Sequence, residues 1–113
     1  MADIASRRKA RKLANARNLA AFANDTKWGE FFAAVEDLGI PLQIKLLYKN
    51  EAFESTSVWV PVPNYVDSKN GPVLFVFVEW IRARAVEEVS RIASDVGLEY
   101  SVANAEVTVY GYK

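Results

Sequence analysis

One carboxylate ends the most apolar run in the chain. Glu79 follows Val73–Val78, and alternation along an extended strand places it on the same face as Phe77. Desolvation raises the pKa of a carboxyl group toward values that suit general acid–base catalysis. Glu79 and Arg82 therefore form a candidate pocket, although Arg82 and Arg84 could instead pair with the carboxylate. We favour a structural carboxylate that meets water or an arginine, because no second carboxylate stands at a spacing that a two-carboxylate mechanism uses.

A second candidate group is the basic cluster near the amino terminus. Residues 1–23 contain six basic residues and one acidic residue, a net charge of +5, so the rest of this neutral chain carries −5. Such cations could bind nucleic acid through its phosphates, without sequence specificity. No stacking aromatic residue lies among them, so we favour a solvated helix or a contact with an acidic protein surface. The residues of the nucleic-acid alternative are Arg7, Arg8, Arg11, Lys12 and Arg17.

Aromatic residues form the third candidate set. Trp28 and Trp80 are expected in the core, where helix meets sheet. Trp59 and Tyr65 lie near a proline-marked turn region, and Trp and Tyr are favoured anchors at protein interfaces. The predicted partner surface comprises Trp59, Tyr65, Asp67 and Lys69.

The missing residue types exclude several chemistries. The chain has no cysteine and no histidine, so it offers no disulfide, thiolate nucleophile, Cys/His metal site or imidazole base. Glycine-rich phosphate loops and a nucleophile elbow are absent as well. We therefore expect no metal and no cofactor, and the sequence favours a non-enzymatic role.

Length and composition indicate one soluble domain. The chain has 113 residues, of which 51% are hydrophobic and 25% charged. Charged residues and Asn interrupt its first segment, which therefore lacks the apolar core of a signal peptide. No stretch has the length of a transmembrane helix, so the expected location is the cytoplasm.

Two helices are expected first. Residues 4–22 are rich in helix formers and contain no Gly or Pro, so residues 1–23 are predicted to form a basic, alanine-rich helical arm. Asn24 can cap a second helix, whose apolar spacing from Trp28 to Leu38 indicates one buried face. Gly39 is placed to end that helix in a left-handed conformation.

The remaining chain predicts a sheet and one more helix. Residues 41–49 alternate as a half-buried strand, and residues 57–62 and 73–80 are expected to form a hairpin. Its second strand would be the middle of the sheet, and a loop at residues 64–70 would protrude. Residues 82–96 show helical spacing that ends at Gly97. Residues 98–112 are either one interrupted strand or two strands with a bend at Asn104 and Ala105.

This order predicts an α+β fold for residues 24–113, taken as a single domain. We expect a mainly antiparallel sheet of about four or five strands with helices packed on one face. The expected order is α-α-β-β-β-α-β, with a doubled last strand as an alternative.

Two short motifs add a resemblance. Asn24-Asp25-Thr26-Lys27-Trp28 opens the second helix, and Val78-Glu79-Trp80-Ile81 ends a strand. A chain with an N-x-T-K-W opener and an I/V-E-W strand end resembles an uncharacterised family of small bacterial proteins. Such proteins are often encoded in mobile or accessory DNA, including integron cassettes, and some resemble toxin-immunity proteins. The resemblance implies no established activity.

Three functional hypotheses follow. The leading one is a non-enzymatic bacterial protein, immunity-like or accessory, that binds a protein partner or itself. A homodimer fits this hypothesis, because the alanine-rich first helix has too little apolar area to be stable alone. The alternatives are a nucleic-acid-binding accessory protein that uses the basic helix, and a small-ligand or enzymatic pocket around Glu79.

Overall fold

The computed structural model describes residues 4–56, 58–62, 65–68 and 71–113. The helices are α1 (Ile4–Ala16), α2 (Asp25–Leu38), α3 (Val86–Val96) and the short 3-10 helix η1 (Phe75–Phe77). The strands are β1 (Leu42–Leu46), β2 (Phe53–Ser55), β3 (Val58–Val62), β4 (Tyr65–Ser68), β5 (Gly71–Leu74), β6 (Val78–Ala83), β7 (Glu99–Ala103) and β8 (Glu106–Tyr110).

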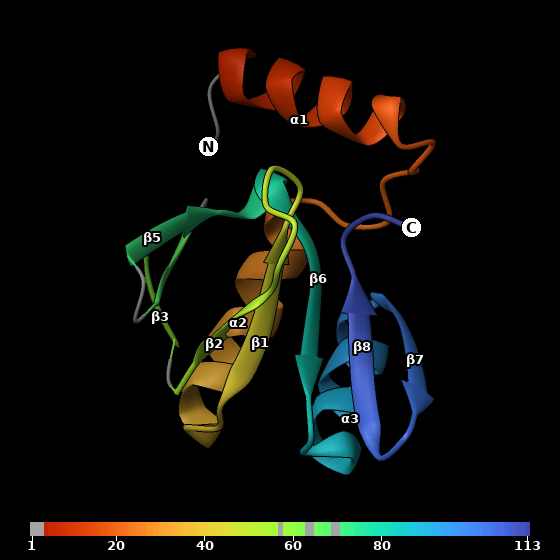
Figure 1. The fold of residues 1–113 in the computed structure, drawn as a ribbon. Helices are drawn as coiled ribbons and strands as arrows, with labels where there is room; N and C mark the ends of the chain where they lie inside the picture. Colours follow the sequence, from red (N-terminus) through yellow and green to blue (C-terminus); the bar gives the residue numbers. More distant parts are fainter. Residues whose placement is uncertain (1–3, 57, 63–64, 69–70) are drawn as a thin grey trace.

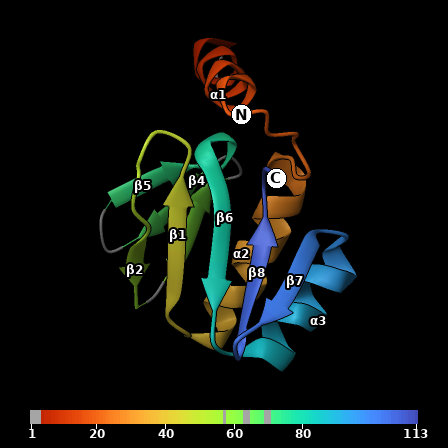
Figure 2. The same ribbon diagram turned by 45° about the vertical axis from the view of Figure 1, so that its right-hand side comes forward.

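These strands form two antiparallel sheets. The larger sheet has the order β2-β1-β6-β8-β7, and the smaller sheet has the order β3-β4-β5. Helices α2 and α3 cover one face of the larger sheet, and α1 crosses one end of the molecule (Figure 1). In the view turned by 45°, α2 and α3 lie behind the larger sheet, and no helix is drawn over the face toward the reader (Figure 2). The predicted α+β class, with helices on one face of an antiparallel sheet, is confirmed.

Helix α2 supplies the centre of the core. Trp28 and Phe31 are among its buried side chains, and Phe32 stacks on Phe75 with ring centroids 5.5 Å apart. The Asn24 side chain accepts a hydrogen bond of 2.8 Å from the Lys27 backbone N–H, as its capping position predicts. At the other end, Gly39 is left-handed with φ of 61°.

Helix α1 is shorter than the predicted 4–22. It ends at Ala16, and Asn18 follows with φ of 56°. The Asn18 N–H donates to the Asn15 carbonyl over 3.1 Å, and the Leu19 N–H donates to the Ala14 carbonyl over 2.9 Å. This pair of bonds is a Schellman ending, in which Asn takes the place that Gly usually fills. The helical propensity of the next residues does not extend the helix past that stop.

The predicted strand at residues 73–80 is wrong as one continuous element, although β6, which contains its last three residues, is the middle strand of the larger sheet. β5 belongs to the smaller sheet and β6 to the larger one, and η1 turns the chain between them. Phe75 enters the main core, whereas Phe77 packs in a second cluster with Ala10 and Leu47. The region expected to protrude as a loop at residues 64–70 contains β4, which pairs on both sides. A hairpin was therefore expected where the chain forms a three-stranded sheet.

The third helix begins later than the predicted residue 82. Arg82 and Ala83 are the last residues of β6, where Arg82 lies opposite Gln43 on one side and Thr108 on the other. Pairing with two neighbouring strands keeps this segment extended, and α3 starts at Val86.

Strand register places Trp80 on the face without helices. Ile44, Ile81 and Val109 lie opposite one another and belong to the core. Trp80 is in the alternate row, opposite Lys45 and Tyr110. Directly opposed residues share a face and successive residues alternate. The expectation that Trp80 packs where helix meets sheet is therefore wrong, whereas Trp28, at 2% exposure, is in the core as predicted.

The carboxyl-terminal segment forms two strands. β7 and β8 pair without interruption from Glu99–Tyr110 to Ala103–Glu106. The connecting residues Asn104 and Ala105 both have positive φ, 54° and 61°. Two such residues are typical of the type I′ hairpin turn, whose twist matches that of the strands.

We predict that Ala105→Gly stabilises the protein. A left-handed conformation costs an L-residue about 1–2 kcal/mol, and part of the gain is offset by the larger backbone entropy of Gly in the unfolded chain. The free energy of unfolding should rise by about 0.5–1 kcal/mol in urea denaturation. Ala103→Gly, two residues earlier in β7, should lower it instead; a loss at Ala105 as well would contradict the turn geometry.

Candidate functional site

A β-bulge in β6 determines where the Glu79 side chain lies. Lys45 is opposite Trp80, whereas Leu46 is opposite Val78, so Glu79 is an extra residue in the ladder. A bulge can re-aim a side chain in this way. The carboxylate therefore meets Lys45, a residue on the face without helices, instead of entering the core with Ile81.

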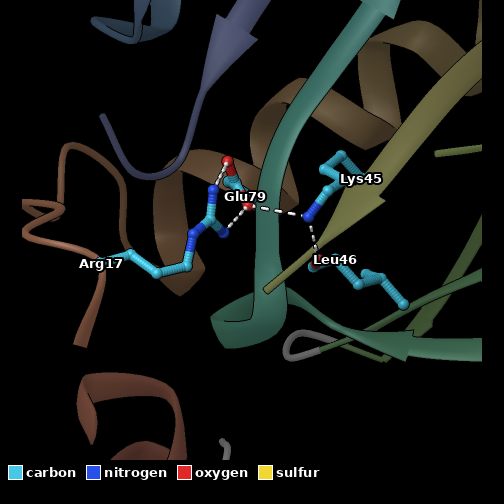
Figure 3. A network of polar contacts seen from close by, with 4 residues as sticks. All are labelled: Arg17, Lys45, Leu46 and Glu79. Atoms are coloured by element: carbon cyan, nitrogen blue, oxygen red, sulfur yellow. Dashed lines mark hydrogen bonds and ion pairs between the residues drawn. The ribbon is translucent and has the colours of Figure 1, made fainter. Parts of the chain in front are cut away.

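Glu79 joins two cations from distant parts of the chain (Figure 3). Arg17 donates from Nη1 to Oε1 over 2.5 Å and from Nη2 to Oε2 over 3.2 Å. The Lys45 ammonium donates to the same Oε1 over 3.0 Å and to the Leu46 carbonyl over 2.7 Å. The side chains of Glu79 and Lys45 are 8% and 11% exposed, against 46% for Arg17. We call these three residues the ion cluster.

The ion cluster keeps Glu79 ionised. Burial acts to raise the pKa of Glu79, but hydrogen bonds and charges from Arg17 and Lys45 outweigh it, and the pKa lies below the ordinary value of 4.5. The hydrogen bond to Glu79 in turn raises the pKa of Arg17. A lowered carboxyl pKa is the opposite of what a general acid at neutral pH requires.

The predicted partners of Glu79 were the wrong arginines. Arg82 donates from Nε to the Thr108 hydroxyl over 3.0 Å and stacks on Trp80 at 4.1 Å from the ring. Among the described residues, the ion pairs of Glu79 are with Arg17 and Lys45, and none joins it to Arg82. Arg17, 62 residues away in sequence, takes the place beside the carboxylate. Apart from the opposite charges, nothing in the sequence indicates this contact.

Helix α1 docks on its own domain through small side chains. Ala10 and Ala14 are buried, and Ala10 packs with Leu47 and Phe77. After the helix, the Ala20 N–H donates to the Lys113 carbonyl over 3.1 Å, so the segment that follows α1 pairs with the carboxyl-terminal residues. The apolar contact is small, and the ion cluster adds an electrostatic attachment next to it.

The five residues of the nucleic-acid hypothesis divide into two groups. Arg7 lies 3.7 Å from Asp25, and Arg17 belongs to the ion cluster, so both face the acidic body. Arg8, Arg11 and Lys12 are exposed and line a shallow hollow of about 500 Å³ on α1. Three of the five candidate residues, Arg8, Arg11 and Lys12, therefore form an exposed basic stripe on α1.

A larger groove lies between α1, the start of α2 and η1. Its volume is about 1120 Å³. Trp28, Phe75 and Val76 contribute apolar surface, and Asp25 and Glu30 contribute carboxylates. Arg7, a residue of the nucleic-acid hypothesis, also lines this groove. The sequence did not predict the groove itself, because it is assembled from segments far apart in the chain.

Tyr112 closes one side of this groove. Its hydroxyl donates to the Val76 carbonyl over 2.7 Å. Burial and the nearby Asp25 carboxylate raise the pKa of Tyr112, so the hydroxyl keeps its proton at neutral pH. Gly111 beside it has no room for a Cβ, which would lie 3.1 Å from the Trp28 ring and closer still to the Val78 carbonyl.

The predicted partner surface lies in the smaller sheet. Trp59 on β3 is opposite Asp67 on β4, and Tyr65 is two residues before Asp67. Tyr65 pairs with Val62 in the same ladder, whose register shifts between Trp59 and Val62. Lys69 lies outside the described residues. The role of this surface stays a prediction.

Two features bear on whether the protein spans a membrane or holds a metal ion. Within residues 4–56, 58–62, 65–68 and 71–113, no helix is long and apolar enough to cross a membrane. In the same part of the chain, no three acidic side chains come together in a way that could hold a metal ion.

Comparison with known proteins places the chain in a family whose function is unknown. A family model described as a family of unknown function, DUF6678, matches residues 10–113. No curated protein and no solved structure matches the chain. The match agrees with the uncharacterised family expected from the sequence.

We predict that Glu79→Gln destabilises the fold by about 3 kcal/mol or more, because it leaves the buried Lys45 ammonium without a carboxylate. Urea denaturation at neutral pH measures the loss. Glu54→Gln on β2, an exposed position, is the matched control and should change the free energy of unfolding by less than about 0.5 kcal/mol. Equal effects of the two substitutions would contradict the structural role of the ion cluster.

The difference between wild type and Glu79→Gln should also depend on pH. A carboxyl group whose pKa is lowered on folding contributes its full stabilisation above its unfolded pKa and loses it as the pH falls through the folded value. The difference should therefore be constant above pH 4.5 and shrink below it. A difference that grows on acidification would mean that the pKa of Glu79 is raised.

Proposed function

Since the chain belongs to DUF6678, a family of unknown function, we propose from its geometry that it acts by binding a protein partner, without catalysis. The groove between α1, α2 and η1 is the proposed binding site. Its volume of about 1120 Å³ exceeds that of most small-molecule pockets and suits a peptide segment. This groove is the observation that carries the proposal.

The lining of the groove supports a partner with apolar and basic side chains. Trp28 and Val76 offer apolar contact area, and aromatic residues are frequent anchors at interfaces. Asp25 is paired with Arg7 at 3.7 Å, and Glu30 adds an exposed carboxylate to the lining. The acidic body as a whole favours the approach of a basic segment.

An enzymatic pocket at Glu79 has less support. Both carboxylate oxygens are hydrogen-bonded to Arg17 or Lys45, and the pKa of Glu79 is lowered. The carboxylate is therefore occupied in holding β1 and the segment after α1 together. The proposed setting, an immunity-like or accessory role in the bacterial cytoplasm, rests on the sequence resemblance alone.

The groove can be tested by filling it. Ala33 is exposed on α2 and lines the groove, so Ala33→Trp should block it without disturbing the core. Peptides selected on the wild-type protein from a display library of short random sequences should combine apolar residues with Lys or Arg. Ala33→Trp should weaken their binding at least tenfold, about 1.4 kcal/mol, in fluorescence titration.

The matched control is Asp37→Trp, which adds the same side chain to an exposed position on the same helix, outside the groove lining. It should leave the affinity unchanged. Failure to select any peptide, or equal binding by the two variants, would refute the groove as the binding site.

A second candidate function is nucleic-acid binding by the stripe of Arg8, Arg11 and Lys12. The observation in its favour is that α1 is docked with these three cations outward. If they contact phosphates, binding of a double-stranded DNA oligonucleotide should fall steeply with salt, with a logarithmic slope of about −3.

The triple substitution of this stripe to alanine should abolish DNA binding. The matched control replaces Lys27, Arg84 and Arg91, which lie outside α1, and therefore removes the same charge. Absence of DNA binding by the wild type, or an equal loss in the control, would end this hypothesis.

A further inference from the structure

Strand β7 is a free edge of the larger sheet. In the described part of the chain, β8 is its one neighbouring strand (Figure 2). All of its residues are exposed, including Tyr100 at 38% and Val102 at 52%. An edge strand presents backbone N–H and C=O groups that can pair with another chain.

The hairpin turn determines which backbone groups face that edge. Ala103 and Glu106 flank the two-residue turn and are opposite one another, so they form a hydrogen-bonded pair. Hydrogen-bonded positions alternate along an antiparallel ladder. The N–H and C=O groups of Tyr100 and Val102 therefore point away from β8, and these are also the residues with exposed apolar side chains.

The sequence of β7 is complementary to itself. If two copies pair antiparallel about a two-fold axis at Ser101, each Tyr100 lies opposite Val102 of the second copy. Both pairs are then hydrogen-bonded and apolar, and an aromatic residue opposite a β-branched one is a favourable cross-strand pair. Each Glu99 lies opposite Ala103 of the second copy, so the two carboxylates do not oppose each other.

Most of the usual protections of a free edge are missing from β7, whose one charged residue is Glu99 at its start. The strand contains no proline and no lysine, and its five pairs with β8 run without a bulge. The edge at the other side of the sheet is different, because β2 has three residues. Long, regular pairing is therefore available at one side of the sheet.

We propose that two copies of this chain associate through their β7 strands in antiparallel register about Ser101, which joins the two larger sheets into one. The interface goes beyond the groove and does not use it. A single strand from each copy buries an area at the small end of specific interfaces, so the dimer dissociates on dilution.

Disulfide trapping tests the register, since the natural chain has no cysteine. At a non-hydrogen-bonded antiparallel pair the Cα atoms are about 4.5 Å apart, which suits a disulfide. Ser101→Cys should therefore form a covalent dimer with oxidised glutathione, which is reduced as the two thiols are oxidised. Non-reducing electrophoresis over time gives the rate.

The matched control is Ala103→Cys on the same strand. Its position lies opposite Glu99 of the second copy, which leaves the two sulfur-bearing residues about 14 Å apart. Ser101→Cys should cross-link at least tenfold faster than Ala103→Cys. Equal rates would show random collision and overturn the proposed register.

Solution mass provides the second test. In sedimentation equilibrium, the average mass of the wild type should rise with protein concentration, toward twice the mass of the monomer. Val102→Lys places a charge on the edge and should remain monomeric, while its circular dichroism spectrum stays that of the wild type. Ile4→Lys, at a 70% exposed apolar position on α1, should dimerise as the wild type does. A wild type that is monomeric throughout, or a dimeric Val102→Lys, would overturn the proposal.

Discussion

The buried pair of Glu79 and Lys45 is the interaction on which much of this structure depends. Removing two charges from water is costly, and the cost is offset where geometry and additional hydrogen bonds are good. Here a bulge in β6 brings the carboxylate to Lys45, and Arg17 supplies two further hydrogen bonds. One carboxylate thereby joins β1, β6 and the segment after α1.

Local signals were sufficient for the position of α2, and they indicated where the final hairpin turns. Asn24 and Gly39 marked the ends of α2, and Asn104 with Ala105 marked a turn between two strands. Each of these signals acts within a few residues, through capping bonds or backbone conformation. They could therefore be recognised without knowledge of the tertiary structure. Asn18, which ends α1 in a left-handed conformation, was a signal of the same kind. It was overlooked because the residues on both sides of it have high helical propensity.

Non-local features could not be predicted in this way. The apolar run at residues 73–80 fits one continuous strand, and nothing within it indicates that η1 divides it between two sheets. The bulge at Glu79 depends on the pairing of β6 with β1, and the contact with Arg17 depends on how α1 is placed. The groove could not be predicted for the same reason, because Asp25, Val76 and Tyr112 are far apart in sequence and come together only in the folded chain.

The alanine contact of α1 has a consequence for cooperativity. Ala10 and Ala14 bury little apolar area, whereas the body is held by a core of large side chains such as Trp28 and Phe32. The arm is attached by this small apolar contact, by backbone hydrogen bonds such as that between Ala20 and Lys113, and by ion pairs, whereas the hydrophobic effect holds the body together. Salt screens the ion pairs and leaves the apolar core intact, so rising ionic strength should loosen the arm before the body.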